Sequence, residues 1–213
     1  MPDTQRNPTL GDLVAEIEDD IARADLNAQV RTAIARAIRH YEGERLGFNE
    51  RTLTFVTTPG VDVYGRGDLA EIPDLYAVDT LVLIEADTVY SLHRVPEAAI
   101  ERHQNLATGA RPCRFSFFDR SLRLDPIPDA AYVLRVTGHV RLPAPLADED
   151  TSPWVDEASS LIAAFAKRHL AMNVLRDPAL ATAQDVLVAE AFRTLLGRAN
   201  RAASSGVIRA HDL

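Results

Sequence analysis

The stretch VRTAIARAIRHYEGERLGFNERTLTFV, residues 30–56, changes its hydrophobic period part-way along. Its first half repeats apolar side chains at the spacing of one helix face, namely Val30, Ile34, Ala37, Ile38 and Tyr41. Its last residues, from Thr52 to Val56, alternate polar and apolar side chains, which is the pattern of a strand with one buried face. The stretch therefore predicts a helix that gives way to a β region.

The residues before this stretch predict a second helix. Thr9 stands in front of a run with apolar residues at helical spacing, and Asp25 or Asn27 can cap the helix that follows. Because only a few residues separate the two helices, they are expected to pack as an antiparallel pair. Residues 1–50 are thus predicted to form an N-terminal helical hairpin.

Downstream, residues 51–141 read as a β-rich insertion. Pro59-Gly60 marks a turn, and the stretch 61–72 reads as a long loop. Two strand pairs are expected in the rest of this region, 80–84 with 89–92 and 113–118 with 121–124. A short helix is expected over 96–106, and a last strand with one solvated face over 132–140.

Helical periodicity returns near the C-terminus. A proline-rich and acidic linker, residues 142–152, precedes Ser152-Pro153, which is a favoured start for a helix. A helix to about residue 175 and another over 181–199 make a C-terminal helical hairpin, 153–200, that is expected to share one bundle with the N-terminal helices. Residues 201–213 are predicted to be an extended tail.

The order of elements is helices, then strands, then helices. Such an order favours the α+β class and excludes a sheet built from alternating strand and helix units. The predicted fold is a bundle of the N-terminal hairpin and two long C-terminal helices, with a small antiparallel β region inserted between them.

Composition excludes several classes of protein. The net charge of −8 argues against a protein that coats nucleic acid, because phosphate neutralisation supplies most of that affinity. Cys113 is the single cysteine, so neither an intrachain disulfide nor a cysteine-based zinc site is expected. There is no signal-like N-terminal stretch and no apolar run long enough to cross a bilayer, so we expect a soluble protein made in the cytoplasm.

No catalytic or cofactor motif stands out. Phosphate loops, dinucleotide fingerprints, nucleophile elbows and His-Glu zinc motifs are missing, and the six histidines are scattered. No cofactor and no metal site is predicted, and the chain is interpreted as a protein without enzymatic activity. One enzymatic alternative stays open, a small hydrolase in which Asp125 converges with Asp79 or Glu85, because such pairs are assembled only by the fold.

Large apolar residues on the C-terminal helices are candidates for a subunit interface. These residues are numerous enough to supply both a core and an interface. For each residue taken by itself, a place in the monomer core is an equal alternative. The predicted interface residues are Trp154, Leu161, Phe192 and Leu195.

Several short motifs, taken in order, resemble those of phage adaptor (head–tail connector) proteins of the podovirus type, including the tail accessory factors of short-tailed phages. They are residues 30–41, Phe48-Asn49-Glu50, Thr52–Phe55, Pro73–Tyr76, Asp79-Thr80-Leu81, Tyr90–Arg94, Leu124–Pro128 and the helix from Trp154 to about residue 175. Each motif is weak alone, while the order and spacing cover most of the chain.

The resemblance implies a structural virion protein. Such adaptors form a ring, typically of twelve copies, beneath the portal protein, extend its DNA channel and offer a platform for a tail or nozzle protein. DNA would pass through without specific binding, and no membrane is involved. The tail is expected to clasp the portal through Arg198, Arg201, Val207, Ile208 and Arg209. Another head-completion or tail-terminator component remains an alternative of the same class.

Overall fold

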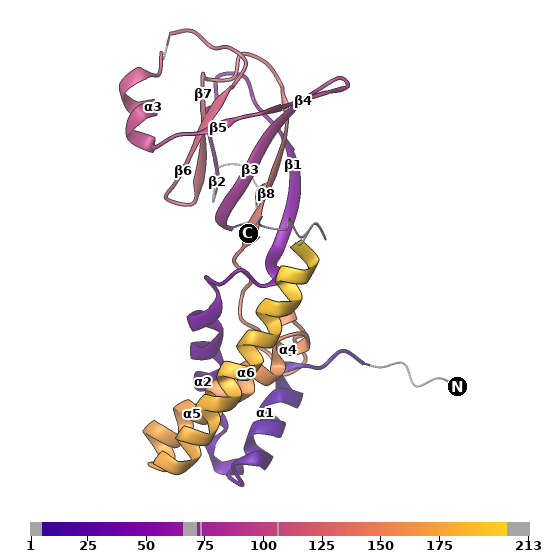
Figure 1. Ribbon diagram of the computed structural model, residues 1–213, viewed down its shortest axis with the longest axis vertical. Coiled ribbons are helices and arrows are strands. Elements are labelled where there is room, and N and C mark those ends of the chain that lie inside the picture. The colour runs from indigo at the N-terminus through magenta and orange to yellow at the C-terminus, as the bar shows by residue number, and fades with distance from the viewer. Residues whose placement is uncertain (1–5, 66–71, 73, 106, 204–213) are drawn as a thin grey trace, which may run out of the picture. The chain divides into compact units, whose positions relative to one another are not determined.

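The computed structural model describes residues 6–65, 72, 74–105 and 107–203. The chain divides into two compact units, which are described separately (Figure 1). A helical unit combines the two ends of the chain, Met1–Phe48 and Leu142–Leu213, and a β unit comprises Asn49–Arg141. The mixed α+β class is confirmed.

The helical unit begins with α1 (Leu10–Asp20) and α2 (Asn27–Tyr41), joined through a short 3₁₀ turn, η1 (Ala24–Leu26). Thr9 caps α1 because its side chain accepts a hydrogen bond from the backbone N–H of Asp12, while the Asp12 carboxylate accepts from the backbone N–H of Thr9. A hydrogen bond from Arg6 lowers the pKa of Asp12 to about 2, so the cap is ionised under all ordinary conditions.

The C-terminal part of this unit is more broken than the sequence predicted. The expected helix over 153–175 is divided into α4 (Pro153–Asp156), α5 (Ser159–Leu170) and a π-helical turn, η3 (Ala171–Leu175). Arg176 then adopts a left-handed conformation with φ of 55°, which ends the helical path. Asp177 accepts a hydrogen bond from the N–H of Leu180 and caps α6 (Pro178–Ala203), the longest helix of the described residues.

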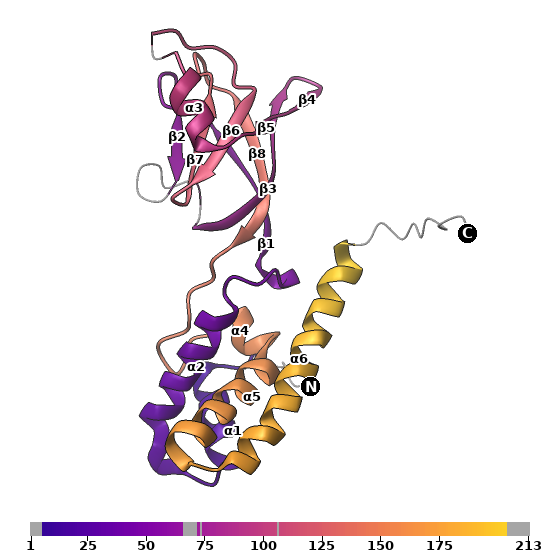
Figure 2. The same cartoon turned by 60° about the vertical axis from the view of Figure 1, so that its left-hand side comes forward.

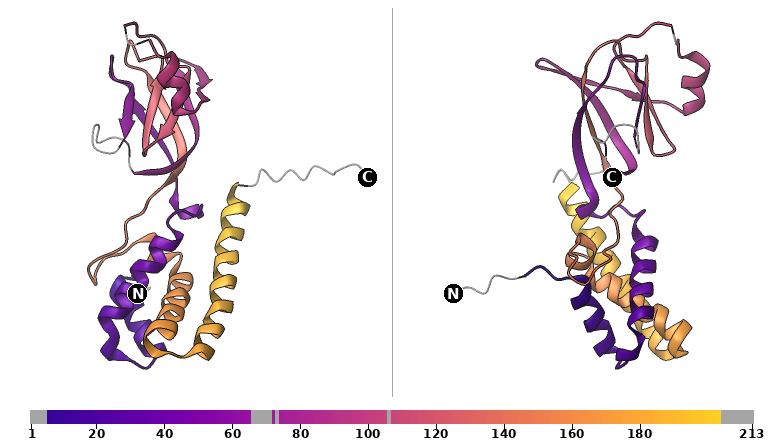
Figure 3. Two further views of the ribbon diagram at one scale, coloured as in Figure 1. Left: turned by 90° about the vertical axis from the view of Figure 1, so that its left-hand side faces the viewer. Right: turned by 180° about the vertical axis from the view of Figure 1, so that it is seen from behind.

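The core of the helical unit lies where α5 packs between α2 and α6 (Figures 2 and 3). Trp154 is fully buried, and its ring meets the ring of Phe48 edge to face at 5.1 Å between centroids. Its indole N–H donates to the carbonyl of Leu142 over 3.2 Å. Residues from both ends of the chain therefore share one hydrophobic core.

The β unit holds two four-stranded sheets. The first sheet is antiparallel throughout, in the order β1-β8-β3-β4, and the second has the order β2-β7-β6-β5, in which β5 and β6 run parallel. The strands and the helix α3 of this unit are β1 (Glu50–Val56), β2 (Val63–Gly65), β3 (Leu75–Glu85), β4 (Thr88–Ser91), β5 (His93–Arg94), α3 (Glu97–His103), β6 (Arg114–Phe118), β7 (Ser121–Asp125) and β8 (Val133–Val140).

The two sheets enclose a hydrophobic core of their own. Phe55 of β1 and Tyr64 of β2 come from different sheets and are both buried, with ring centroids 5.4 Å apart. The Tyr64 hydroxyl donates to the carbonyl of Val61, which satisfies the polar end of this buried ring. The helix α3 packs against β6 and buries Ile100.

The prediction of a small β insertion in a helical bundle was wrong, because the strands are substantial. Two signals were hidden in the sequence. The strand β2 is three residues long, too short to show a period, and lies inside the predicted loop 61–72. The strand β3 is longer than predicted, and register shifts near its start interrupt its alternation, between Leu75 and Ala77 and between Val78 and Thr80.

A pair of glycines tests this packing. A Cβ on Gly138, in the middle of β8, would lie 2.1 Å from the carbonyl oxygen of Ala77, whereas one on Gly197 in α6 would meet nothing within 4 Å. Gly138→Ala is expected to destabilise the β unit by about 3 kcal/mol. Gly197→Ala is expected to stabilise α6 by about 0.5–1 kcal/mol. Denaturant unfolding followed by circular dichroism, with hydrogen exchange over residues 49–141, measures both; equal effects would contradict the close strand approach.

Candidate functional site

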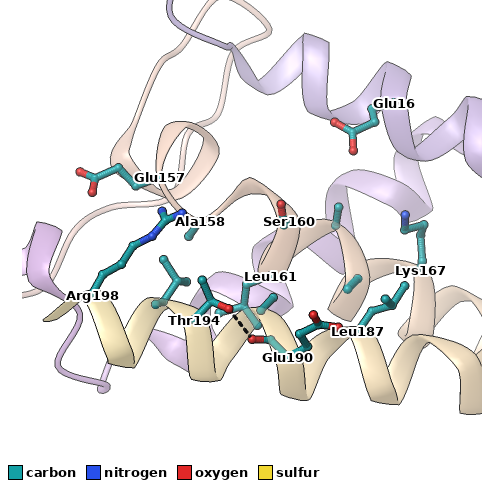
Figure 4. Close-up of a pocket in the computed structure, with 14 residues that line it drawn as sticks. Glu16, Glu157, Ala158, Ser160, Leu161, Lys167, Leu187, Glu190, Thr194 and Arg198 are labelled. Carbon is teal, nitrogen blue, oxygen red and sulfur yellow. Dashed lines mark hydrogen bonds between the residues drawn. The ribbon is translucent and has the colours of Figure 1, made fainter. Parts of the chain in front are cut away.

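A surface cavity of about 410 Å³ lies in the helical unit, between α1, α5 and α6 (Figure 4). Its floor consists mainly of small side chains of α5, including Ala163 and Ala164, which let the surface sink between the flanking helices. Leu187 of α6 is exposed at one wall. The charged residues of the cavity are Glu16, Glu157, Lys167, Glu190 and Arg198.

Two polar side chains at the cavity have partners within the helical unit. Lys167 donates to the Asp20 carboxylate at 2.6 Å, so the charge of this lysine is balanced inside the unit. Thr194 donates its hydroxyl proton to the backbone carbonyl of Glu190 and is not held by a base (Figure 4). An apolar floor with a charged rim is the composition of a surface that packs against another polypeptide.

The four predicted interface residues occupy different places. Trp154 and Leu161 are fully buried in the core of the unit, and Leu195 is 9% exposed. Phe192 is partly buried, with its ring 5.3 Å from that of Tyr41. Leu161 and Leu195 nevertheless line the cavity. Trp154 has no surface left for a neighbouring subunit, because the monomer core already covers it.

The predicted portal-binding residues lie at and beyond the end of α6. Arg198 and Arg201 are exposed on the last turns of this helix, and Arg198 also lines the cavity. Val207, Ile208 and Arg209 lie outside the described residues. The folded part of the chain thus brings two of the five residues together on one helix end.

The carboxylates of the hydrolase alternative each stand in a different setting. Asp125 is buried and accepts hydrogen bonds from the guanidinium of Arg114, with 2.8 Å between Nε and Oδ2. Glu85 pairs with Arg111 at 3.1 Å, and Asp79 is exposed. None of these carboxylates lines the cavity between α1, α5 and α6, and within the described part of the chain no cluster of metal-ligating side chains occurs. Asp125 and Glu85 are each held by an arginine.

Sequence reasoning missed a charged cluster in the β unit. The guanidinium of Arg123 on β7 contacts Asp62, at 3.0 Å, and Glu97, at 2.7 Å. It also contacts Glu101 and donates to the side-chain oxygen of Gln104 at 2.8 Å. The spacing of Glu97, Glu101 and Gln104 on one face of α3 was visible in the sequence, but the fold alone shows that they meet an arginine.

The cluster controls the protonation of Glu97. Burial opposes ionisation of this carboxyl group, but hydrogen bonds from Ser116 and Arg123 outweigh burial and hold the pKa of Glu97 below its ordinary value. The same carboxylates raise the pKa of Arg123 against the effect of burial. The cluster is a structural clamp between α3 and the strand β7.

Comparison with protein families decides the class of this protein. The family model described as SU10 adaptor protein matches residues 8–210, nearly the whole chain. The chain belongs to the SU10 adaptor protein family. It is therefore a phage structural adaptor and a component of the virion, and the resemblance to phage adaptor proteins is confirmed. A search of curated proteins finds no match.

The structure of this SU10 adaptor family member adds one finding on membranes. Among the described residues, no helix is both long and apolar enough to cross a bilayer.

The Arg123 clamp predicts a pH-dependent loss of stability. Arg123→Met leaves three carboxylates facing one another, and we expect it to destabilise the β unit by about 2 kcal/mol at pH 7. Because the pKa of Glu97 is depressed in the folded state, its contribution is present above the unfolded pKa and disappears as pH falls through the folded value. The difference between wild type and variant should therefore shrink below about pH 4.

Unfolding by denaturant between pH 3 and pH 7 measures this difference. Arg102→Met, a change at an exposed arginine of α3 that makes no ion pair with the described residues, serves as the control for the loss of an arginine charge. A difference that stays constant with pH would exclude the carboxylates as its cause.

Proposed function

We propose that this protein forms the adaptor ring that joins the portal to the tail and extends the DNA channel. The observation that carries the proposal is the family match over residues 8–210, together with α6, whose last described turns carry the exposed Arg198 and Arg201. A ring of twelve copies, as in the adaptors that the sequence resembles, would place the tail or nozzle protein below it.

The portal contact is assigned to the end of the chain. Arg198 and Arg201 are exposed on α6, and the sequence after them, SSGVIRAHDL, supplies an apolar pair and Arg209. Arginine suits the recognition of carboxylates on a partner surface because its planar group donates in pairs. A segment of Val207, Ile208 and Arg209 would combine apolar anchoring with that pairing.

The interface between copies is assigned to residues around α5 and α6. The cavity of about 410 Å³ presents exposed Leu187 at its wall and Leu195 in its floor, with fully buried Leu161 supporting the floor from beneath. Phe192 stands beside them on α6, partly buried. Trp154 would act from beneath, by fixing α4 against the core. A closed ring needs two different faces on each copy, so this cavity would be one half of a heterologous contact.

The acidic balance of the chain suits a conduit for DNA. With a net charge of −8, the ring would repel phosphates on average, and so DNA would slide through without being held. The partners that follow from this proposal are the portal protein, a tail or nozzle protein and further copies of the chain.

Removal of the tail tests the portal contact. A chain that ends before residue 202 should fold as the wild type does, with the same unfolding midpoint, because the described cores lie upstream. Its attachment to the portal should be abolished. Cosedimentation with portal rings measures attachment, and a chain with residues 204–213 replaced by a Gly/Ser sequence of equal length is the control for length alone. Full attachment of the truncated chain would contradict the assignment.

Self-association tests how the ring forms. Without the portal, the protein is expected to be a monomer or a weak oligomer, because binding to a preformed ring of sites raises the effective concentration of neighbouring copies. Native mass spectrometry of the free protein and of portal complexes makes the comparison. A stable free dodecamer would refute this order of assembly.

A further inference from the structure

An apolar row crosses the outer face of the first sheet in the β unit. Val56 of β1 pairs with Val133 of β8, Val133 pairs with Ile84 of β3, and Ile84 pairs with Val89 of β4. Directly paired residues project on the same side of a sheet, so the four side chains form one continuous row. Val56 is 48% exposed and Val89 is 53% exposed. The row is solvent-facing along its whole length.

Next to this row the face is mostly polar, although Val82 of β3, which pairs with Arg135, also lies on it. Four positions from the apolar row, Thr52, Thr137 and Thr80 form a cross-strand row of hydroxyl groups. Between the two rows lies Arg135, which is exposed and makes no ion pair with any described residue. A contiguous apolar strip beside a free cation is typical of a surface that binds a protein.

A complementary feature projects from the other sheet. Phe118 ends β6 and is 67% exposed, an unusual exposure for an aromatic side chain. Asp119 follows it, exposed and without an ion pair to the described residues. This tip therefore carries an aromatic ring next to a free anion, the counterpart of the apolar row next to a free cation.

The turn at this tip is tied to the rest of the β unit. Asp119 and Arg120 both have left-handed φ values, 46° and 60°, as a tight two-residue turn requires. The guanidinium of Arg120 lies 3.5 Å from the Asp74 carboxylate, which ties the turn to the body of the unit. The turn fixes the backbone position of Phe118, and an aromatic side chain has few rotatable bonds to lose on binding, so Phe118 is suited to be an anchor.

The two features lie on opposite outer faces. On β6, Phe115 points into the core, whereas Ser116 lies on the other face, where it contacts Glu97 of α3. Phe118 is two residues after Ser116 and projects on that outer side. The apolar row lies on the face of the first sheet that is turned away from buried Leu134 and Val136. One copy therefore cannot satisfy both features by itself.

We propose that Phe118 of one copy packs on the row Val56–Val133–Ile84–Val89 of the next copy, with Asp119 paired to Arg135 beside it. Two unlike faces of one chain then meet repeatedly, which closes a ring through the β units. The inference rests on the proposed ring and names a contact for it that is separate from α5 and α6.

Crosslinking tests the contact directly. In a Cys113→Ser background, which removes the exposed native thiol, Asp119→Cys and Arg135→Cys are combined in one chain and treated with a short bis-maleimide in portal complexes. The double variant should give a ladder of covalent oligomers. An equal mixture of the two single variants should give dimers and nothing larger, because each chain then carries one reactive partner. Crosslinks to another virion protein, or no ladder in loaded complexes, would overturn the proposal.

Substitutions test the energetics. Phe118→Ala should raise the adaptor concentration for half-loading of the portal about thirtyfold, as expected for loss of an aromatic anchor. Leu146→Ala, which truncates an 87% exposed leucine in the helical unit, is the matched control and should load as the wild type does. Asp119→Arg and Arg135→Asp should each weaken loading, and their combination should restore it. Failure of the combined charge exchange to restore loading would count against the ion pair.

The outcomes separate this contact from the proposed function. If the wild-type chain does not load on the portal, the adaptor role falls, and crosslinking of the concentrated free protein still decides the contact. If the wild-type chain loads and no ladder forms between residues 119 and 135, the contact falls and the adaptor role stands.

Discussion

The packing of α5 between α2 and α6 joins the two ends of the chain in one core, and the rest of the structure depends on it. The helices that meet there are separated by the whole β unit along the sequence. Phe48 precedes the β unit in the sequence and Trp154 follows it. The packing of these two rings therefore holds the segment that enters the β unit beside the segment that leaves it. This core fixes α2, α5 and α6 against one another. It therefore sets the positions of the exposed end of α6 and of the cavity between α1, α5 and α6.

The second unit is stabilised in a different way. Its sheets bury aromatic and aliphatic side chains between them, and its surface helix α3 is clamped by one arginine, Arg123, that contacts carboxylates from separate segments. Such a clamp balances charge within the unit. Arg135 and Asp119 make no ion pair with the described residues, and each lies beside exposed apolar groups.

Family membership and surface chemistry agree on the kind of work this protein does. A phage structural adaptor interacts with other virion components. The helical unit offers a cavity and a basic helix end, and the β unit offers an apolar row and an aromatic tip. Two of the carboxylates considered for hydrolysis are held in ion pairs, Asp125 with Arg114 and Glu85 with Arg111.

The sequence by itself determined the mixed class, the positions of α1, α2 and α6, the strand pairs around residues 86–87 and 119–120, and the family. These features depend on local periodicity, capping and turn residues, which are readable along the chain. Only the tertiary structure decided that the β region is a two-sheet unit, that Trp154 and Leu161 face inward, and that Arg123 meets the acidic face of α3. Pairing between distant strands and burial are set by contacts between remote segments, and such contacts leave no period in the sequence.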